Sequence, residues 1–194
     1  MGRRDTTTEL ALAAGRGDRG ALSEFIRRTQ ADVWMFLARS AGPDHADDLT
    51  QETFLRMLGS LPGFEGRSSA LTWLLAIARR VAVDRYRWDL ARPSLVLADR
   101  QVDGDVGGAG HDPAEAVQVM AMLNLLDDDR RDALILTQLM GFSYAECAEI
   151  CGCPVGTIRS RVARARADLV IAYRLRDAAP GGRRLPTPSD RARF

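Results

Sequence analysis

The segment from residue 142 to residue 170 has the pattern of a helix, a tight turn and a strongly basic second helix. Ser143 can cap the first helix, and Gly152 can adopt the left-handed backbone that a sharp turn needs. Pro154 suits the start of the second helix, where its missing N–H costs nothing. The pattern predicts a helix–turn–helix unit. Nowhere does the sequence alternate convincingly in the way of a β-strand.

The second helix of this unit has two different faces. At about 100° per residue, its apolar side chains gather on one side. These are Ile158, Val162, Ala165 and Leu169. The opposite side carries Arg159, Ser160, Ala163 and Arg164, with Arg166 nearby. An apolar seam that docks the helix, with a cationic face directed outward, is what a helix that reads the major groove of DNA requires.

The amino-terminal part of the chain also predicts helices. Apolar residues recur at helical spacing from Leu22 to Leu37, and Gly42-Pro43 ends that helix. A second helix begins near Asp44 and breaks at Leu61-Pro62-Gly63. Its apolar side consists of Leu49, Thr53, Phe54, Met57 and Leu58. Three helices are expected before residue 89, and Ser68 or Ser69 can cap the third.

Residues 89–112 differ in kind, because they are rich in Gly and contain five Asp. Such a segment cannot bury enough apolar surface to fold alone and predicts a linker. Residues 113–176 are again helical in pattern, and the Pro-, Gly- and Arg-rich residues 177–194 predict a disordered tail. The expected fold is all-α: two small helical domains, residues 8–88 and 113–176, joined by a flexible acidic linker.

The charges are strongly segregated, although the net charge is only +1. Residues 154–176 hold six Arg and one Asp, and residues 67–92 hold six Arg and two Asp. Residues 44–52 carry four carboxylates and no Lys or Arg. Two basic patches and one acidic patch indicate polyanion contacts at two sites and a separate protein contact.

Several classes of protein do not fit this sequence. It has no run of about 18 apolar residues and no signal peptide, so we expect no membrane span and a cytoplasmic location. Cys147, Cys151 and Cys153 have no His nearby and lack zinc-ligand spacing. We interpret them as small buried apolar side chains, with redox sensing as the alternative. Neither His45 nor His111 has a catalytic set around it, so we expect no enzyme and no cofactor.

Three segments in order resemble one family. They are DDLTQETFLRML at 47–58, FEGRSSALTWLLAIARRVAVDRYR at 64–87 and CPVGTIRSRVARAR at 153–166. With an acidic linker between the second and third, they closely resemble the extracytoplasmic-function sigma factors of bacteria, within the sigma-70 family. The resemblance implies a two-domain initiation factor that binds core RNA polymerase and directs it to promoters. The alternatives are a stand-alone helix–turn–helix regulator and a scaffold whose acidic helix recruits a protein.

The resemblance also implies which residues bind polymerase. Asp48, Gln51, Glu52 and Arg56 match the residues that bind the clamp helices of the β′ subunit. Their spacing of i, i+3, i+4 and i+8 puts them on one helix face. The family further implies a contact with the β flap of polymerase and control by an anti-sigma factor wedged between the two domains.

Two promoter elements are assigned in the same way. The third helix and the loop before it resemble the part that opens and captures the −10 element as a single strand, which needs a basic groove and a pocket for a base. The matching residues are Phe64, Arg67, Ser68, Ser69, Arg79, Arg80, Asp84, Arg85 and Arg87. The basic helix resembles the one that reads the −35 element in duplex DNA. Its matching residues are Thr157, Arg159, Ser160, Ala163, Arg164 and Arg166.

Overall fold

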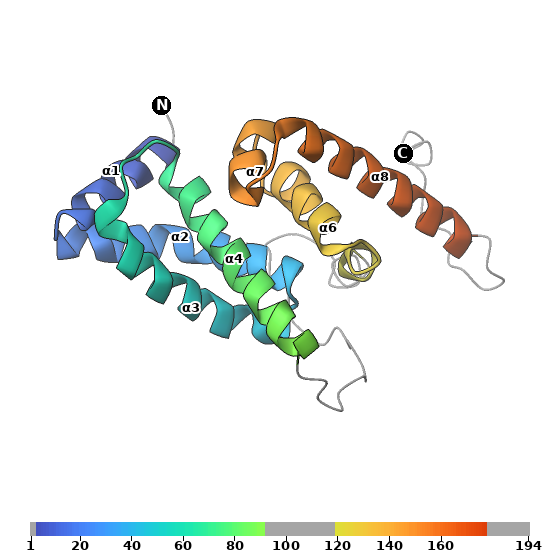
Figure 1. The fold of residues 1–194 in the computed structure, drawn as a ribbon, viewed down its shortest axis with the longest axis horizontal. Helices are drawn as coiled ribbons and strands as arrows, with labels where there is room; N and C mark the ends of the chain where they lie inside the picture. The colour runs from blue at the N-terminus through green and yellow to red at the C-terminus, as the bar shows by residue number, and fades with distance from the viewer. Residues whose placement is uncertain (1–2, 92–118, 178–194) are drawn as a thin grey trace, which may run out of the picture.

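The computed structural model describes residues 3–91 and 119–177, and every regular element in these ranges is a helix (Figure 1). The amino-terminal domain consists of α1 (Arg3–Gly15), α2 (Arg19–Ser40), α3 (Pro43–Ser60) and α4 (Ala70–Ala91). The carboxy-terminal domain contains α6 (Asp128–Leu134), α7 (Tyr144–Cys151) and α8 (Val155–Asp177), and residues 119–123 are also helical. The predicted all-α fold of two helical domains is confirmed.

Most of the predicted linker and nearly all of the predicted tail lie outside the described residues. The helix α4 continues to Ala91, three residues beyond the expected end of the first domain. Among the helices of the described ranges, none is long and apolar enough to cross a membrane.

The amino-terminal domain is a bundle in which α2 packs against α1, α3 and α4. Asp18 caps α2 by accepting a hydrogen bond from the Ala21 N–H at 2.9 Å, and Pro43 occupies the first turn of α3. The fully buried side chains of the bundle include Phe25, Val33, Phe36, Leu37, Met57, Leu74 and Leu75. Each such side chain stabilises the fold by about 1.5–3 kcal/mol relative to an exposed position.

The helix–turn–helix unit forms as predicted. Ser143 makes a reciprocal capping box with Glu146 at the start of α7, and Gly152 ends that helix at φ 63°. The carbonyl of Pro154 accepts the first hydrogen bonds of α8, from Thr157 and Ile158. Ile158, Val162 and Ala165 are buried, so the predicted apolar seam is the face by which α8 docks.

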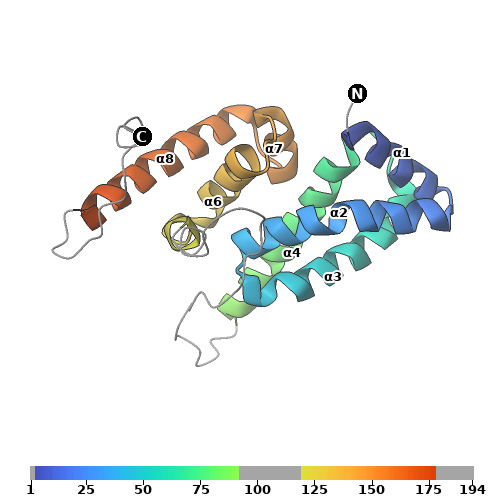
Figure 2. The ribbon, with the colours of Figure 1, turned by 180° about the vertical axis from the view of Figure 1, so that it is seen from behind.

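The two domains are in contact with each other. The helix α4 packs against α7, and α2 contacts α6 and residues 135–139 that follow it. Figures 1 and 2 show α8 extending away from the amino-terminal bundle, with only its first turns near α7. Two basic helices, α4 and α8, therefore have different surroundings: one lies at the contact between domains and the other lies on the outside.

Candidate polymerase and promoter interfaces

The outward face of α3 carries the four residues assigned to polymerase. Asp48, Gln51 and Arg56 are exposed, and Glu52 is half-buried. The guanidinium of Arg56 donates to Glu52 at 2.8 Å and to Asp84 of α4 at 2.6 Å. The hydrogen bonds to Asp84 and Glu52 raise the pKa of Arg56 above its ordinary value. This arrangement ties the acidic face of α3 to the basic helix α4.

The sequence interpretation missed an apolar residue at the centre of this face. Leu55 is 64% exposed, and its helical position falls between those of Asp48, Gln51 and Glu52. Leu58 is 43% exposed, although we expected it on the buried side of α3. Exposed apolar side chains rimmed by polar ones are typical of a protein-binding surface. A helical projection of α3 centred on Asp48 could have found Leu55.

The loop before α4 holds two of its assigned residues in structural contacts. The Phe64 ring lies 4.7 Å from the Trp73 ring, centroid to centroid, and Ser69 caps α4 by accepting from the Thr72 N–H at 3.1 Å. Ser68 is half-buried. Arg67 is 86% exposed and pairs with the exposed Glu65 at 3.1 Å. Arg67 is therefore the assigned loop residue most open to a ligand.

The basic residues of α4 are in unequal surroundings. Arg80 and Arg87 are exposed, and the guanidinium of Arg85 lies 5.4 Å from the centroid of the Trp88 ring. The side chain of Arg79 is only 16% exposed, because it projects toward the carboxy-terminal domain. The remaining assigned residue of this helix, Asp84, is the exposed partner of Arg56.

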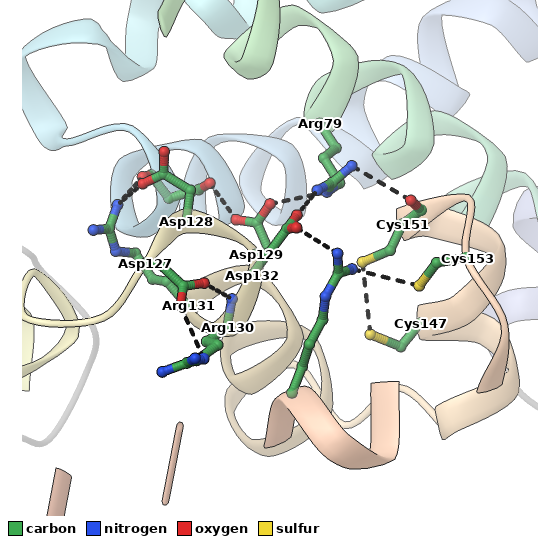
Figure 3. A network of polar contacts seen from close by, with 12 residues as sticks. Arg79, Asp127, Asp128, Asp129, Arg130, Arg131, Asp132, Cys147, Cys151 and Cys153 are labelled. Carbon is green, nitrogen blue, oxygen red and sulfur yellow. Dashed lines mark hydrogen bonds and ion pairs between the residues drawn. The ribbon is translucent and has the colours of Figure 1, made fainter. Parts of the chain in front are cut away.

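Arg79 is the centre of an ionic network between the domains (Figure 3). Its guanidinium donates to Asp132 at 2.9 Å, to Asp129 at 2.5 Å and to the carbonyl of Cys151 at 3.4 Å. Asp132 is buried and also accepts from the Ser40 hydroxyl at 2.5 Å. Burial raises the pKa of Asp132, against the opposing effects of Ser40 and Arg79. The network joins α2, α4, α6 and the end of α7.

A cleft of about 650 Å³ lies beside this network. Its amino-terminal wall includes Arg79, Arg85 and Arg87, and its other wall consists of Asp127, Asp128, Asp129 and Asp132. The basic side of α4 thus faces the acidic start of α6 in this structure. Of these three Arg residues, Arg79 is the one paired with carboxylates of that wall, so a phosphate that binds Arg79 must displace Asp129 and Asp132.

Within residues 3–91 and 119–177, no acidic wall covers the cationic face of α8. Its exposed residues are Arg159, Ser160, Ala163, Arg164 and Arg166, and Thr157 is half-buried. Arg166 donates to the side-chain oxygen of Gln138 at 2.6 Å. Arg161, on the flank of the helix, instead turns inward and pairs with Asp129. Helical periodicity could not predict that pairing, because 32 residues separate the two partners.

The three cysteines lie at the turn between α7 and α8. Cys147 and Cys151 are buried, as expected, with their Sγ atoms 4.0 Å apart. Cys153 is half-buried and its Sγ accepts from Arg161 at 3.4 Å. Hydrogen bonding to Cys151 and burial raise the pKa of Cys147. In the part of the chain that the structure describes, no group of His, Cys, Asp and Glu is arranged to hold a metal ion.

Comparison with known proteins agrees with this architecture. The family description "Sigma-70 region 2" matches residues 25–89, and "Sigma-70, region 4" matches residues 116–169. The chain is 51% identical over 179 residues to the ECF RNA polymerase sigma factor SigC of Mycobacterium tuberculosis, covering 91% of this chain and 93% of that protein. It is 40% identical over 137 residues to EcfG of Rhodopseudomonas palustris, covering 69% of this chain and 74% of the relative.

Two solved structures have the same fold. The sigma factor RpoE of Bartonella quintana, in complex with the anti-sigma factor NepR, has a TM-score of 0.68 and 29% identity, covering 79% of this chain and 97% of that one. CnrH, in complex with the cytosolic domain of CnrY, has a TM-score of 0.68 and 26% identity, covering 88% and 98%. With two sigma regions in order and a relative that shares half of its residues, the chain belongs to the extracytoplasmic-function sigma factors, which direct RNA polymerase to promoters.

Proposed function

We propose a division of labour between the two domains of this sigma factor. Residues 8–88 bind core polymerase through α3 and capture the −10 element through the 63–69 loop and α4. Residues 113–176 read the −35 element through α8. The observation that carries the proposal is α8 itself, whose cationic residues are exposed on the side opposite the buried Ile158, Val162 and Ala165. The protein has no catalytic step of its own and acts in the cytoplasm, where polymerase and DNA are found.

On α3, the polymerase-binding surface consists of Asp48, Gln51, Glu52 and Arg56, with Leu55 at its centre. An exposed Leu surrounded by polar groups supports a contact in which the apolar side chain is buried and the charges form the rim. The family resemblance assigns this surface to the clamp helices of β′, and assigns a second contact to the β flap through the carboxy-terminal domain.

On α8, Arg159 and Arg164 supply the donors that best match guanine O6 and N7 in the major groove. Thr157, Ser160 and Arg166 contact phosphates or base edges beside them, and Ala163 packs on a thymine methyl. Each well-placed Arg–guanine contact contributes about 1–3 kcal/mol of discrimination.

The −10 element binds at the 63–69 loop and along α4. Phe64, Arg67, Ser68 and Ser69 belong to the loop that receives an unstacked base. Arg79, Arg80, Asp84, Arg85 and Arg87 line the path of the strand along the helix. Because Arg79 is held by Asp129 and Asp132, the carboxy-terminal domain must move away before Arg79 can reach a phosphate.

Regulation by a protein partner fits the same cleft. The related RpoE is solved with the anti-sigma factor NepR. A cleft of about 650 Å³ between the two domains, with one basic and one acidic wall, is the place for an anti-sigma factor of this chain to insert.

Run-off transcription tests the proposed function. Purified core RNA polymerase from the source bacterium is incubated with and without the chain, across a library of genomic fragments. We expect new start sites that share two spaced upstream elements. Retention of duplex fragments by the chain alone, without new starts, would instead identify a stand-alone regulator and overturn the proposal.

A further inference from the structure

We propose that Thr8, on α1, is a positioning residue for the 63–69 loop and thereby sets the selectivity of −10 base capture. The inference rests on the proposed function of that loop. Thr8 does not belong to the loop or to α4, and it is distant from both in sequence. Its side chain nevertheless bonds the first residue of α4, where the loop ends, and lies close to the turn at Gly66.

The first contact is at the start of α4. The N–H of Ala70 donates to Thr8 Oγ1 at 3.0 Å across 62 residues of sequence. The first N–H groups of a helix have no partner within the helix and need a cap. Ser69 supplies one acceptor, through its hydroxyl, to the N–H of Thr72 at 3.1 Å. Thr8 supplies another from outside, so the end of the loop is fixed to α1 as well as to α4.

The second contact is at the middle of the loop. Gly66 adopts φ +72°, and a Cβ atom at this position would lie 3.4 Å from a Leu12 methyl and 3.7 Å from the Cγ2 methyl of Thr8. Leu12 and Thr8 of α1 therefore lie close to the turn at Gly66 and leave little room for a side chain there. The hydroxyl of Thr8 thus fixes the residue at which the loop joins α4, and its methyl group is on the side of the Gly66 turn.

The remaining contacts leave a small part of the loop open. Phe64 packs its ring on Trp73 and fixes the beginning of the loop. Glu65 and Arg67 are exposed between these supports. The side chains that can meet a base are thus carried on a backbone that is supported in part by Thr8 and Leu12 of α1, which lie outside the loop. A shift of that backbone changes which base fits, so removal of the support alters selectivity as well as affinity.

Two substitutions separate the role of the Thr8 hydroxyl from that of its methyl group. Thr8→Val keeps the shape and the methyl group but removes the acceptor for Ala70. Thr8→Ser keeps the acceptor. Thr8→Val should flatten the preference among the four bases, and its loss of affinity should not exceed about fivefold, because the free energy of one helix cap limits what the lost acceptor can cost. Thr8→Ser should retain the base preference of the unchanged protein.

The measurement uses holoenzyme assembled from core polymerase and the full chain. The probe is a fork-junction DNA whose single-stranded −10 segment is randomised, and bound molecules are sequenced. The variants are Thr8→Val, Thr8→Ser and Arg67→Ala, and duplex −35 preference is measured in parallel. The inference is supported if Thr8→Val flattens the −10 preference and Thr8→Ser does not. The −35 preference should be unchanged in both variants.

The other outcomes are distinguishable. If Arg67→Ala changes the −10 preference and Thr8→Val does not, Thr8 is merely structural and this inference is wrong. If neither variant changes it, the loop does not capture the base and the proposed function of the loop fails as well. Should Thr8→Val not fold, Gly66→Ala perturbs the same support from the loop side, and an unchanged preference in that variant overturns the inference.

Discussion

The helices α4 and α8 have nearly the same pattern in sequence but different situations in the structure. Each has a buried apolar side and a concentration of Arg on the other, and both are predicted to contact DNA. On α8, Arg159 and Arg164 are exposed. On α4, the side chain of Arg79 is 16% exposed and is paired with two carboxylates of the other domain. A helical pattern shows which side chains point away from the core of their own domain. It does not show which of them form ion pairs with a second domain.

The difference has an energetic consequence. An exposed Arg loses little when its neighbours change, whereas removal of one partner of a buried pair leaves an uncompensated charge. Asp132 is the more deeply buried partner, with a side chain that is 4% exposed. Substitutions of Arg159 and Arg164 should therefore affect DNA recognition alone, and substitutions of Arg79 should affect the arrangement of the domains.

The largest expected effect is on α8. The paired substitution Arg159→Ala and Arg164→Ala should remove about 1–3 kcal/mol of base discrimination per contact, which for the two contacts together is about 30-fold at the lower bound. Transcription from promoters with intact and scrambled −35 elements measures it. Arg174→Ala, which removes an exposed Arg farther along the same helix, is the matched control and should retain the discrimination. An equal loss in this control would mean that general charge, and not base reading, accounts for the effect.

The next effect concerns the contact between domains. Arg79→Ala should destabilise the closed arrangement by up to about 3 kcal/mol, because the buried Asp132 loses its cation. Small-angle scattering of the isolated chain should then give a larger radius of gyration. Arg80→Ala is the control, since Arg80 is the exposed neighbour on α4. A radius that is the same for Arg79→Ala as for the unchanged chain would show that the ionic network does not hold the domains together.

A smaller effect is expected at the polymerase-binding surface of α3. Leu55→Ser should weaken binding to core polymerase about tenfold, a loss typical of a central apolar contact. The fold should be unaffected, because Leu55 is 64% exposed. Leu125→Ser is a matched control at a Leu that is 67% exposed in the other domain. Competition binding with labelled core polymerase compares the two, and equal affinities would remove Leu55 from the interface.

The smallest effect is at the cap of α7. Ser143→Ala removes the acceptor of the capping box and should lower stability by about 1 kcal/mol. It should leave the Arg79 network in place, because Ser143 is not part of it. Urea unfolding followed by circular dichroism measures the shift in midpoint. A shift that is accompanied by an expanded chain would show that the two domains are coupled through α7.

Local signals account for what could be predicted. The cap at Ser143, the left-handed turn at Gly152 and the seam of Ile158 and Val162 each depend on residues within a few positions of one another. The break after α3 was also predicted, and of the two candidate caps for α4, Ser68 and Ser69, the structure has Ser69. Such features depend on helix geometry and backbone hydrogen bonding, which the sequence specifies over short distances.

Contacts between distant residues account for what could not be predicted. Arg79 and Asp132 are 53 residues apart, and Thr8 and Ala70 are 62 apart. No periodicity links such pairs, because their meeting depends on how the helices pack. Leu55 is a different case, since its outward position followed from helix geometry and only its apolar character concealed it.

One measurement tests most directly the claim that two separate parts of the chain read two separate elements. A promoter found by run-off transcription is altered by single-base changes in either element. It is then transcribed with the unchanged chain, with the Arg159→Ala and Arg164→Ala pair, and with Arg67→Ala. The account predicts that the α8 pair loses sensitivity only to changes in the −35 element, and Arg67→Ala only to changes in the −10 element. Loss of sensitivity to both elements in either variant would contradict it.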